Sequence, residues 1–509
     1  MLSKPVQEKA YTYIPAKTFK ESAFFQRRLE IGAVSLILVA AAALRLYGLT
    51  AKSLWWDEIY DIMAVRPLNL LDSLTYYDPY NLHPGLFKAI LNLWINTIGI
   101  AEFQVRVFSV VVSMLLLALV YYLTRRWFDI RIALTSTLLL AVSPLQLFWS
   151  QSIRPYAWLT LLVAISMGLT YQVSEKPRQN WYWVAYGLSM LAMIYTHYLG
   201  FYVIFSQILF LLVVLYKNWG AILRLAITLA GVVVAFLPWL DHFLSHNEMS
   251  HTFFSSLSDN RGWSTVLEAV EMLSSWFIPN SLTFVAGGVA LPLYLVGLVW
   301  LWQNQRKLAL FLVSWGLLPV IMAWLSGLIR SNYTIHYYYM AFCLPGFLIV
   351  MAAGIWSLKK QSRFAPYLLV GLCVALSLAA CWNYRQNYQY QDWRELANYV
   401  ATHREDGDVV LMADLAVYGF DYYYVYNFGS PANIERKPMS REPSSALRIA
   451  EIFKNHPRVW IVRWYINDPD WLLKNVMDNI PTNYSSLYYQ EYPSNRQGAI
   501  SLILYGRNK

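Results

Sequence analysis

An adjacent pair of carboxylates, Asp57 and Glu58, follows Trp55 and Trp56 just beyond the first long apolar segment of the chain. Charged side chains are costly near the hydrocarbon boundary of a bilayer, so acids held there usually have a task. One carboxylate of such a pair can accept a proton from a hydroxyl group while the other orients it. The pair therefore predicts a general base at a membrane surface. The alternative is that both acids belong to an acidic surface loop.

Most of the elements that position this pair are predicted to be transmembrane helices. Of the 509 residues, 57% are hydrophobic and 14% are charged, and the mean hydropathy is +0.37. A bilayer core of about 30 Å requires about 20 apolar residues per helix. Candidate spans lie at 30–49, 105–123, 132–150, 156–173, 181–196, 198–216, 222–240, 281–302, 308–328, 338–357 and 365–382.

One further apolar stretch, 84–100, is short and is interrupted by Lys88, Asn92 and Asn96. If it crossed the membrane, the later loops rich in Lys and Arg would all lie outside, against the positive-inside rule. We therefore predict about eleven spans, with 84–100 as an amphipathic helix in the outer interface. This topology places the N-terminus in the cytoplasm of a plasma-membrane protein. The net charge of +10 then belongs mostly to inner loops and requires no nucleic-acid partner.

The composition after the last span is that of a soluble domain, which an odd number of spans places outside the cell. A helix is expected to begin near Asp392, and buried strands are expected at 408–412, 458–462 and 501–505. The fold class is thus an α-helical polytopic membrane protein with a small extracytoplasmic α/β domain. The predicted divisions are a cytoplasmic segment at 1–29, a transmembrane domain at 30–382 and the α/β domain at 383–509. The tyrosines at 422–424 and 426 are interpreted as a strand with its packing surface, or else as a surface that stacks on sugars.

Several polar residues are predicted at the outer ends of the spans, on the same side as Asp57. Arginine suits bidentate contact with phosphate, and acids beside cations at a lipid boundary indicate a substrate with a phosphate head and a hydrocarbon tail. A polyprenyl-phosphate sugar has this form. Alternatively, each arginine snorkels to the interface, and each histidine is an interfacial hydrogen-bonding group. The residues are Arg45, His83, Arg106, Arg154, His197, Arg330 and His336.

No metal or cofactor is assigned from the sequence. The cysteines at 343, 373 and 381 have no metal-binding spacing and form no evident disulfide framework. The chain also has no phosphate-binding loop of the Walker type. His242 and His246 have the spacing of a helical metal site, but such pairs are common. We favour a loop on the acceptor side for this region, so a divalent metal is possible but not indicated.

The chain resembles the C-type integral-membrane glycosyltransferases, most closely bacterial relatives of the protein O-mannosyltransferases and of the lipid A aminoarabinose transferases. The resemblance begins with Leu44-Arg45-Leu46-Tyr47-Gly48-Leu49 and Ser53-Leu54-Trp55-Trp56-Asp57-Glu58. It continues through His83-Pro84, 103–109, 150–157 and 195–198, and it covers about residues 30–350. The Asp-Glu pair in its context is the most specific of these features.

The resemblance implies transfer of a hexosyl or pentosyl group from a polyprenyl-phosphate-linked donor, on the outer face and with inversion. The acceptor would be a hydroxyl of an envelope glycan, lipid or protein. Asp57 would be the general base, and Glu58 would support it or bind the acceptor. His83, Arg106 and Arg154 would lie near the donor phosphate. Relatives often have an Arg-Tyr pair where this chain has His336 and Tyr337, so His336 or Arg330 would supply that contact.

Two other functions remain open at this stage. A transporter or flippase of lipid-linked saccharides also needs polar cavities and many spans, but such proteins usually have paired halves or broken helices near the midplane. No internal repeat is evident, and the polar groups cluster at one face. A non-catalytic envelope scaffold would leave the Asp-Glu pair unexplained.

Overall fold

The structure is a computed structural model that describes residues 16–76, 83–255, 283–329, 337–413, 415–427, 435–439, 444–464, 471–494 and 498–508. Arg330 and His336 lie outside the described residues, as does the side chain of His246. The roles expected of these three residues stay predictions.

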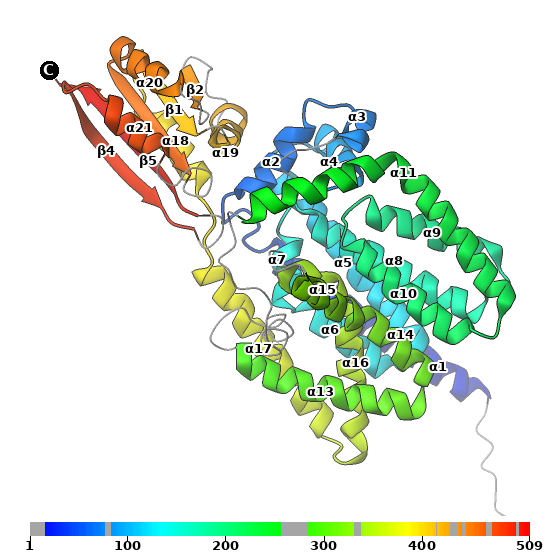
Figure 1. Ribbon diagram of the computed structural model, residues 1–509. Coiled ribbons are helices and arrows are strands. Elements are labelled where there is room, and N and C mark those ends of the chain that lie inside the picture. Colours follow the sequence, from blue (N-terminus) through cyan, green and yellow to red (C-terminus); the bar gives the residue numbers. More distant parts are fainter. Residues whose placement is uncertain are drawn as a thin grey trace, which may run out of the picture.

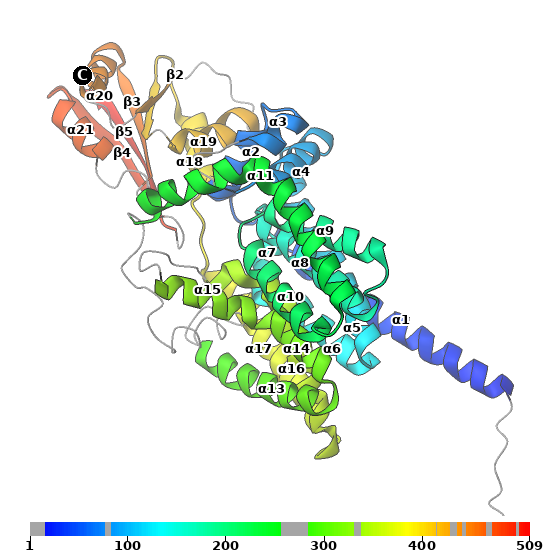
Figure 2. The same ribbon diagram turned by 45° about the vertical axis from the view of Figure 1, so that its right-hand side comes forward.

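A bundle of helices makes up most of the molecule, and a small α/β unit lies at one end of it (Figures 1 and 2). The short helices that follow the first long helix lie at that same end. The elements up to the last long helix are α1 (Ala16–Leu46), α2 (Trp56–Val65), α3 (Leu70–Thr75), α4 (Gly85–Thr97), α5 (Glu102–Trp127), α6 (Ile130–Ala141), α7 (Pro144–Ser150), α8 (Pro155–Glu175), α9 (Asn180–Ile194), α10 (Gly200–Leu215), α11 (Trp219–Ser255), α13 (Thr283–Asn304), α14 (Arg306–Gly316), α15 (Leu318–Ile329), η1 (Tyr337–Cys343), α16 (Leu344–Ser357), η2 (Leu358–Lys360) and α17 (Ala365–Asn387).

The predicted class of multi-pass membrane protein is confirmed. Within the described ranges, seven helical segments are long and apolar enough to cross a membrane, or eight if one bent pair counts as a span. Helices are the expected solution because every backbone polar group must be satisfied inside the segment. The number eleven, the orientation of the termini and the interfacial position of α4 stay predictions.

The span predicted at 132–150 is a pair of helices, α6 and α7, bent by 59°. The break lies at Ser143-Pro144, because the residue before a proline disfavours helical backbone. The Ser143 hydroxyl accepts from Gln146 N at 3.4 Å and so caps α7. Arg45, which is fully buried, donates to the carbonyl of Ala141 at 2.9 Å. A cation at the last turn of α6 satisfies backbone acceptors that the bend leaves open.

The α/β unit contains a five-stranded mixed sheet with the order β2-β1-β3-β5-β4. Strand β1 pairs in parallel with β2 and β3, whereas β5 is antiparallel to β3 and β4. Helices α18 and α19 contact β5 and β1, and α20 contacts β3. Its elements are α18 (Trp393–His403), β1 (Val409–Ala413), α19 (Ala416–Asp421), η3 (Tyr422–Asn427), β2 (Glu435–Met439), α20 (Ser444–Asn455), β3 (Arg458–Trp464), α21 (Trp471–Asn479), β4 (Tyr484–Tyr492) and β5 (Ile500–Arg507).

The three strands and the helix predicted in this unit are confirmed as β1, β3, β5 and α18. Asp392 caps α18 by accepting from Glu395 N at 3.0 Å. The strand predicted at 422–424 is wrong, because these tyrosines form the π-helical turn η3 that continues α19. Their rings are fully buried, so they do not form a sugar-stacking surface. Aromatic residues favour strands only where a pleated surface is available to them, and here they pack against the helical bundle.

The α/β unit directly contacts the loop between α1 and α2, which we predicted to be the first outer loop. The hydroxyl of Tyr423 donates to the Glu102 carboxylate at the start of α5 and accepts from Leu54 N at 2.7 Å. One residue before Asp57, Trp56 donates from Nε1 to Leu415 O at 2.8 Å and from its backbone N to Gln391 Oε1 at 3.0 Å. The unit therefore fixes the backbone on which the candidate base lies.

Tyr423→Phe is expected to destabilise the protein by about 1–3 kcal/mol, because it leaves a buried amide and a buried carboxylate without their hydroxyl partner. The measurement is the thermal unfolding midpoint of purified protein in detergent. Tyr426→Phe is the matched control, since Tyr426 lies in the same turn and is 39% exposed. Equal loss of stability in the two variants would contradict this docking contact.

Candidate active site

Arg106, from the first turns of α5, holds the loop between α1 and α2 in place. Its Nη1 donates to Leu49 O at 3.0 Å and Lys52 O at 2.7 Å, and its Nη2 donates to Ser53 O at 3.1 Å. Nη2 and Nε also donate to the two oxygens of Glu58, at 2.8 and 3.4 Å. A guanidinium has five N–H groups, and all five are engaged here. The side chain is 1% exposed.

Glu58 is fully buried and accepts four hydrogen bonds. Besides the two from Arg106, it accepts from Ile153 N at 2.7 Å and from Trp55 N at 3.2 Å. The last of these contacts satisfies an amide at the start of α2, where an acidic side chain is also favoured by the helix dipole. Glu58 thus joins α2, α5 and the segment before α8, and its carboxylate faces the protein interior.

Asp57 points to a different environment from its neighbour. Its side chain is 19% exposed, and its carboxylate lies 3.6 Å from Arg154 Nη2. Arg154 also donates from Nη1 to Asp57 O at 3.1 Å and to Asp61 Oδ2 at 2.5 Å. Arg154 precedes Pro155 and has extended backbone, as expected before a proline. This backbone conformation directs the Arg154 side chain away from α8 and towards α2.

Asp61 is a residue that the sequence reasoning missed. It is 1% exposed and pairs with Arg154. Residues four apart on a helix share a face, so the spacing between Asp57 and Asp61 was the signal available. The arginine between the two carboxylates fixes the orientation of both.

Two histidines lie next to this cluster. His83 Nε2 is 3.4 Å from Arg154 Nη2, and the rings of His83 and His197 have centroids 4.3 Å apart. His197 Nδ1 accepts from Leu199 N at 3.1 Å, so the proton of its neutral ring is on Nε2. Tyr156, in the first turn of α8, contacts His197 at 5.4 Å between ring centroids. The three rings form one cluster, and His83 is the member that contacts the Arg154 guanidinium.

The structure therefore divides the residues selected from the sequence into groups. Asp57, Arg154, His83 and His197 lie together, and Glu58 and Arg106 form a buried pair behind them. Arg45 lies at the bend between α6 and α7. Across the described ranges, no group of three or more His, Cys, Asp or Glu side chains is arranged to hold a metal ion.

Solved structures with the same fold are membrane glycosyltransferases. ArnT from Cupriavidus metallidurans, in its apo state, aligns with a TM-score of 0.61 and 13% identity, over 93% of this chain and 98% of that one. ArnT bound to undecaprenyl phosphate aligns at 0.59, with the same identity and coverage. The oligosaccharyltransferase AglB from Archaeoglobus fulgidus, in complex with an inhibitory peptide and a dolichol-phosphate, aligns at 0.55 with 10% identity, over 93% of this chain and 74% of that one. The chain thus has the fold of the C-type integral-membrane glycosyltransferases.

A family model gives the more particular relationship. Residues 82–242 match the dolichyl-phosphate-mannose-protein mannosyltransferases, a segment that contains His83, Arg106, Arg154 and His197. The resemblance predicted from the sequence is confirmed. No curated protein sequence matches the chain significantly.

Proposed function

We propose that the protein is a glycosyltransferase that moves a sugar from a polyprenyl-phosphate donor to a hydroxyl of an envelope glycan, lipid or protein. The reaction takes place at the outer face of the plasma membrane and inverts the anomeric carbon. The observation that carries the proposal is the partly exposed carboxylate of Asp57, 3.6 Å from the guanidinium of Arg154. The shared fold with ArnT, which was solved with undecaprenyl phosphate, supports the lipid-phosphate donor.

Asp57 supplies the base for the acceptor. A hydroxyl is a weak nucleophile, and the carboxylate takes its proton as the oxygen forms a bond to the anomeric carbon. The bond from that carbon to the phosphate oxygen breaks on the opposite face of the sugar, and its electron pair stays on the phosphate. The products are the inverted glycoside and polyprenyl phosphate, with the proton on Asp57.

The leaving phosphate needs positive charge and hydrogen-bond donors rather than a proton, because its negative charge increases as the bond breaks. Arg154 is suited to this task, since its Nε is buried without a hydrogen-bond partner in the described structure. His83 lies within contact of the same guanidinium, and the ring of His197 contacts that of His83. We assign these three residues to the donor side of the site.

Glu58 and Arg106 are assigned positioning roles, in place of the substrate contacts that the resemblance implied. Every N–H of Arg106 is engaged by protein acceptors, so contact with a phosphate would require breaking a buried pair. Asp61 is also assigned a positioning role, because its carboxylate forms an ion pair with Nη1 of Arg154.

The test is transfer by purified protein in lipid nanodiscs. Polyprenyl-phosphate donors that carry a labelled hexose or pentose are mixed with an extract of envelope glycans, lipids and proteins. Transfer of label with release of polyprenyl phosphate is expected, and the anomeric configuration of the product reports inversion. A flippase would move the intact donor across a vesicle membrane, and a scaffold would do neither. Either of these results without covalent transfer would overturn the proposal.

Arg154→Lys is expected to lower transfer by about 10–100-fold while the charge is retained. Lysine lacks the planar fork that binds Asp57 and Asp61 at once, and a hydrogen bond to a charged group contributes about 1.5–3 kcal/mol. Steady-state transfer rates at several donor concentrations measure the effect. Arg448→Lys, at an exposed arginine of α20, is the control. If Arg154→Lys transferred sugar at the rate of the unmodified protein, Arg154 would not take part in the reaction.

A further inference from the structure

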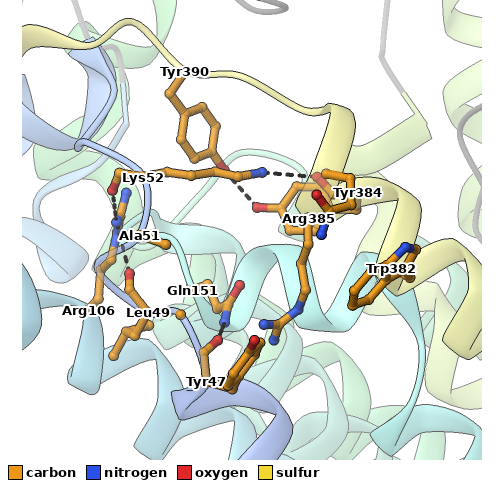
Figure 3. A pocket seen from close by; sticks show the side chains of 12 residues that line it. Tyr47, Leu49, Ala51, Lys52, Arg106, Gln151, Trp382, Tyr384, Arg385 and Tyr390 are labelled. Atoms are coloured by element: carbon orange, nitrogen blue, oxygen red, sulfur yellow. Dashed lines mark hydrogen bonds between the residues drawn. The ribbon is translucent and has the colours of Figure 1, made fainter.

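A separate cavity of about 210 Å³ lies where the end of α1, the first outer loop and the end of α17 meet (Figure 3). Asp57, Arg154 and the two histidines of the candidate active site are not among its lining residues. Twelve residues line it, and among them are the cations and tyrosines Tyr47, Lys52, Arg106, Tyr384, Arg385 and Tyr390.

The cavity has a positive charge that the described part of the chain does not neutralise. Lys52 Nζ donates to Tyr384 O at 2.9 Å and lies 4.2 Å from the centre of the Tyr384 ring. Arg385 donates from Nη2 to Leu44 O at 2.7 Å and lies over the Tyr47 ring at 4.5 Å. Neither cation forms an ion pair with any residue that the structure describes, and no acid lines the cavity. Arg106 is already paired with Glu58, so the excess is two charges.

Two partly buried cations without a counter-charge are unfavourable, because each loses hydration and they repel one another. The effect is visible in Lys52, since burial, together with the nearby Arg106 and Arg385, lowers its pKa to about 8. An anion in the cavity would relieve both costs. Arginine and lysine with aromatic rings on either side are also a suitable set for a phosphate group.

The position of the cavity indicates where that anion comes from. Helices α1 and α17 are both long and apolar enough to cross a membrane, and the cavity lies at the end of each. Tyr47 and Trp382, which line it, are 70% and 64% exposed, as aromatic residues are in the interfacial belt of a membrane protein. The cavity is smaller than the roughly 300–1,000 Å³ pockets that enclose drug-sized ligands. It therefore suits a headgroup whose tails stay in the bilayer.

We propose that this cavity binds the phosphate headgroup of an anionic membrane phospholipid, with its acyl chains beside α1 and α17. Lys52 and Arg385 are the residues that hold the phosphate. The carbonyl of Lys52 also accepts from Arg106 Nη1 at 2.7 Å, so a lipid bound here tightens the loop that leads to Asp57. The inference does not depend on sugar transfer.

The test is lipid binding by purified protein in detergent, followed by native mass spectrometry and by the thermal unfolding midpoint. Phosphatidylglycerol is expected to bind and to raise the midpoint, more than phosphatidylcholine does. Lys52→Met/Arg385→Met is expected to weaken phosphatidylglycerol binding by about tenfold or more. Lys474→Met, at an exposed lysine of α21, is the control and should bind as the unmodified protein does.

Three outcomes would overturn the proposal. If the unmodified protein bound phosphatidylglycerol and phosphatidylcholine equally well, the cavity would not be a site for anionic lipid. The same would follow if the double methionine variant bound phosphatidylglycerol as well as the Lys474→Met control does. Equal affinity for water-soluble glycerol phosphate would show a free phosphate ligand and not a lipid. Lys52→Arg/Arg385→Lys, which keeps both charges, should retain most of the binding even if the double methionine variant folds poorly.

Binding should also weaken as pH rises through about 8, because Lys52 then loses its charge. The charged and titratable groups that face Lys52 are Arg106, Arg385, Tyr384, Tyr388 and Tyr390. Burial raises the pKa of Tyr390 well above its ordinary value, so it stays neutral. The affinity for phosphatidylglycerol is measured at about pH 6.5 and about pH 9.5, and it should be lower at the higher pH. In Lys52→Arg this difference in affinity should disappear, because arginine stays charged at both pH values. A loss that persists in Lys52→Arg would exclude Lys52 as its source.

Discussion

Asp57→Asn is expected to lower the rate of sugar transfer by about 10²–10⁴-fold, the usual contribution of a general base. Asparagine has the same shape and keeps a hydrogen-bonding oxygen, but it cannot accept the acceptor's proton. The side chain of Asp57 is partly exposed, at 19%, and Arg154 keeps its ion pair with Asp61 in this variant, so stability should be little affected. The loss should therefore appear in the chemical step and leave donor binding nearly unchanged.

Single-turnover transfer with a labelled donor measures this effect, and binding of the donor is followed separately. Asp406→Asn, at an exposed acid of the α/β unit, is the control for the loss of one negative charge. If Asp57→Asn transferred sugar at the rate of this control, Asp57 would not be the base. Asp61, the only other nearby acid on the same face of α2 among the described residues, would then be the next candidate.

Arg106→Met is expected to destabilise the protein by about 3–5 kcal/mol, since removal of one partner leaves the other charge of a buried pair uncompensated. The charge left behind is that of Glu58, which is fully buried. The carbonyls of Leu49, Lys52 and Ser53 lose their donor as well. Transfer should also fall, because the loop before Asp57 is no longer fixed.

The measurement is the unfolding midpoint in detergent, with transfer followed in parallel. Arg126→Met is the matched control, because Arg126 belongs to the same helix α5 but is exposed. Arg106→Met/Glu58→Gln should recover part of the stability, since no buried charge remains. If Arg106→Met and Arg126→Met unfolded at the same temperature, the pair would not be the anchor of the first outer loop. Recovery of stability without recovery of transfer is expected, because the loop contacts stay lost.

The α/β unit also packs against the segment that contains Asp57. Trp56 stacks on Trp464 of β3 with ring centroids 4.8 Å apart, and it donates hydrogen bonds to two residues that follow the last span. The residue next to the candidate base is thus packed against a domain more than three hundred residues away in the sequence. Such long-range contacts hold a catalytic group in place more precisely than a free loop can.

The class of fold and the segment that contains the candidate base could both be predicted from the amino-acid sequence. Long apolar runs predict membrane helices because the bilayer imposes a length and excludes charge. The strands β1, β3 and β5 were predictable because each is a short run of buried residues between polar ones. The Asp57-Glu58 pair was recognisable because acids next to a span are unusual.

The different environments of the two acids could not be predicted from the sequence, because they depend on how distant segments pack. Successive residues of a helix point about 100° apart, so Asp57 and Glu58 necessarily face different surroundings, but their order in the chain does not say which one faces inward. That depends on Arg106 and Ile153, which come from other elements and enclose Glu58. The pairing of Asp61 with Arg154, the bend at Ser143-Pro144 and the turn at Tyr422–Asn427 were likewise decided by packing. Local periodicity specifies an element and its buried face, whereas the partner of a buried charge is specified by segments distant in the sequence.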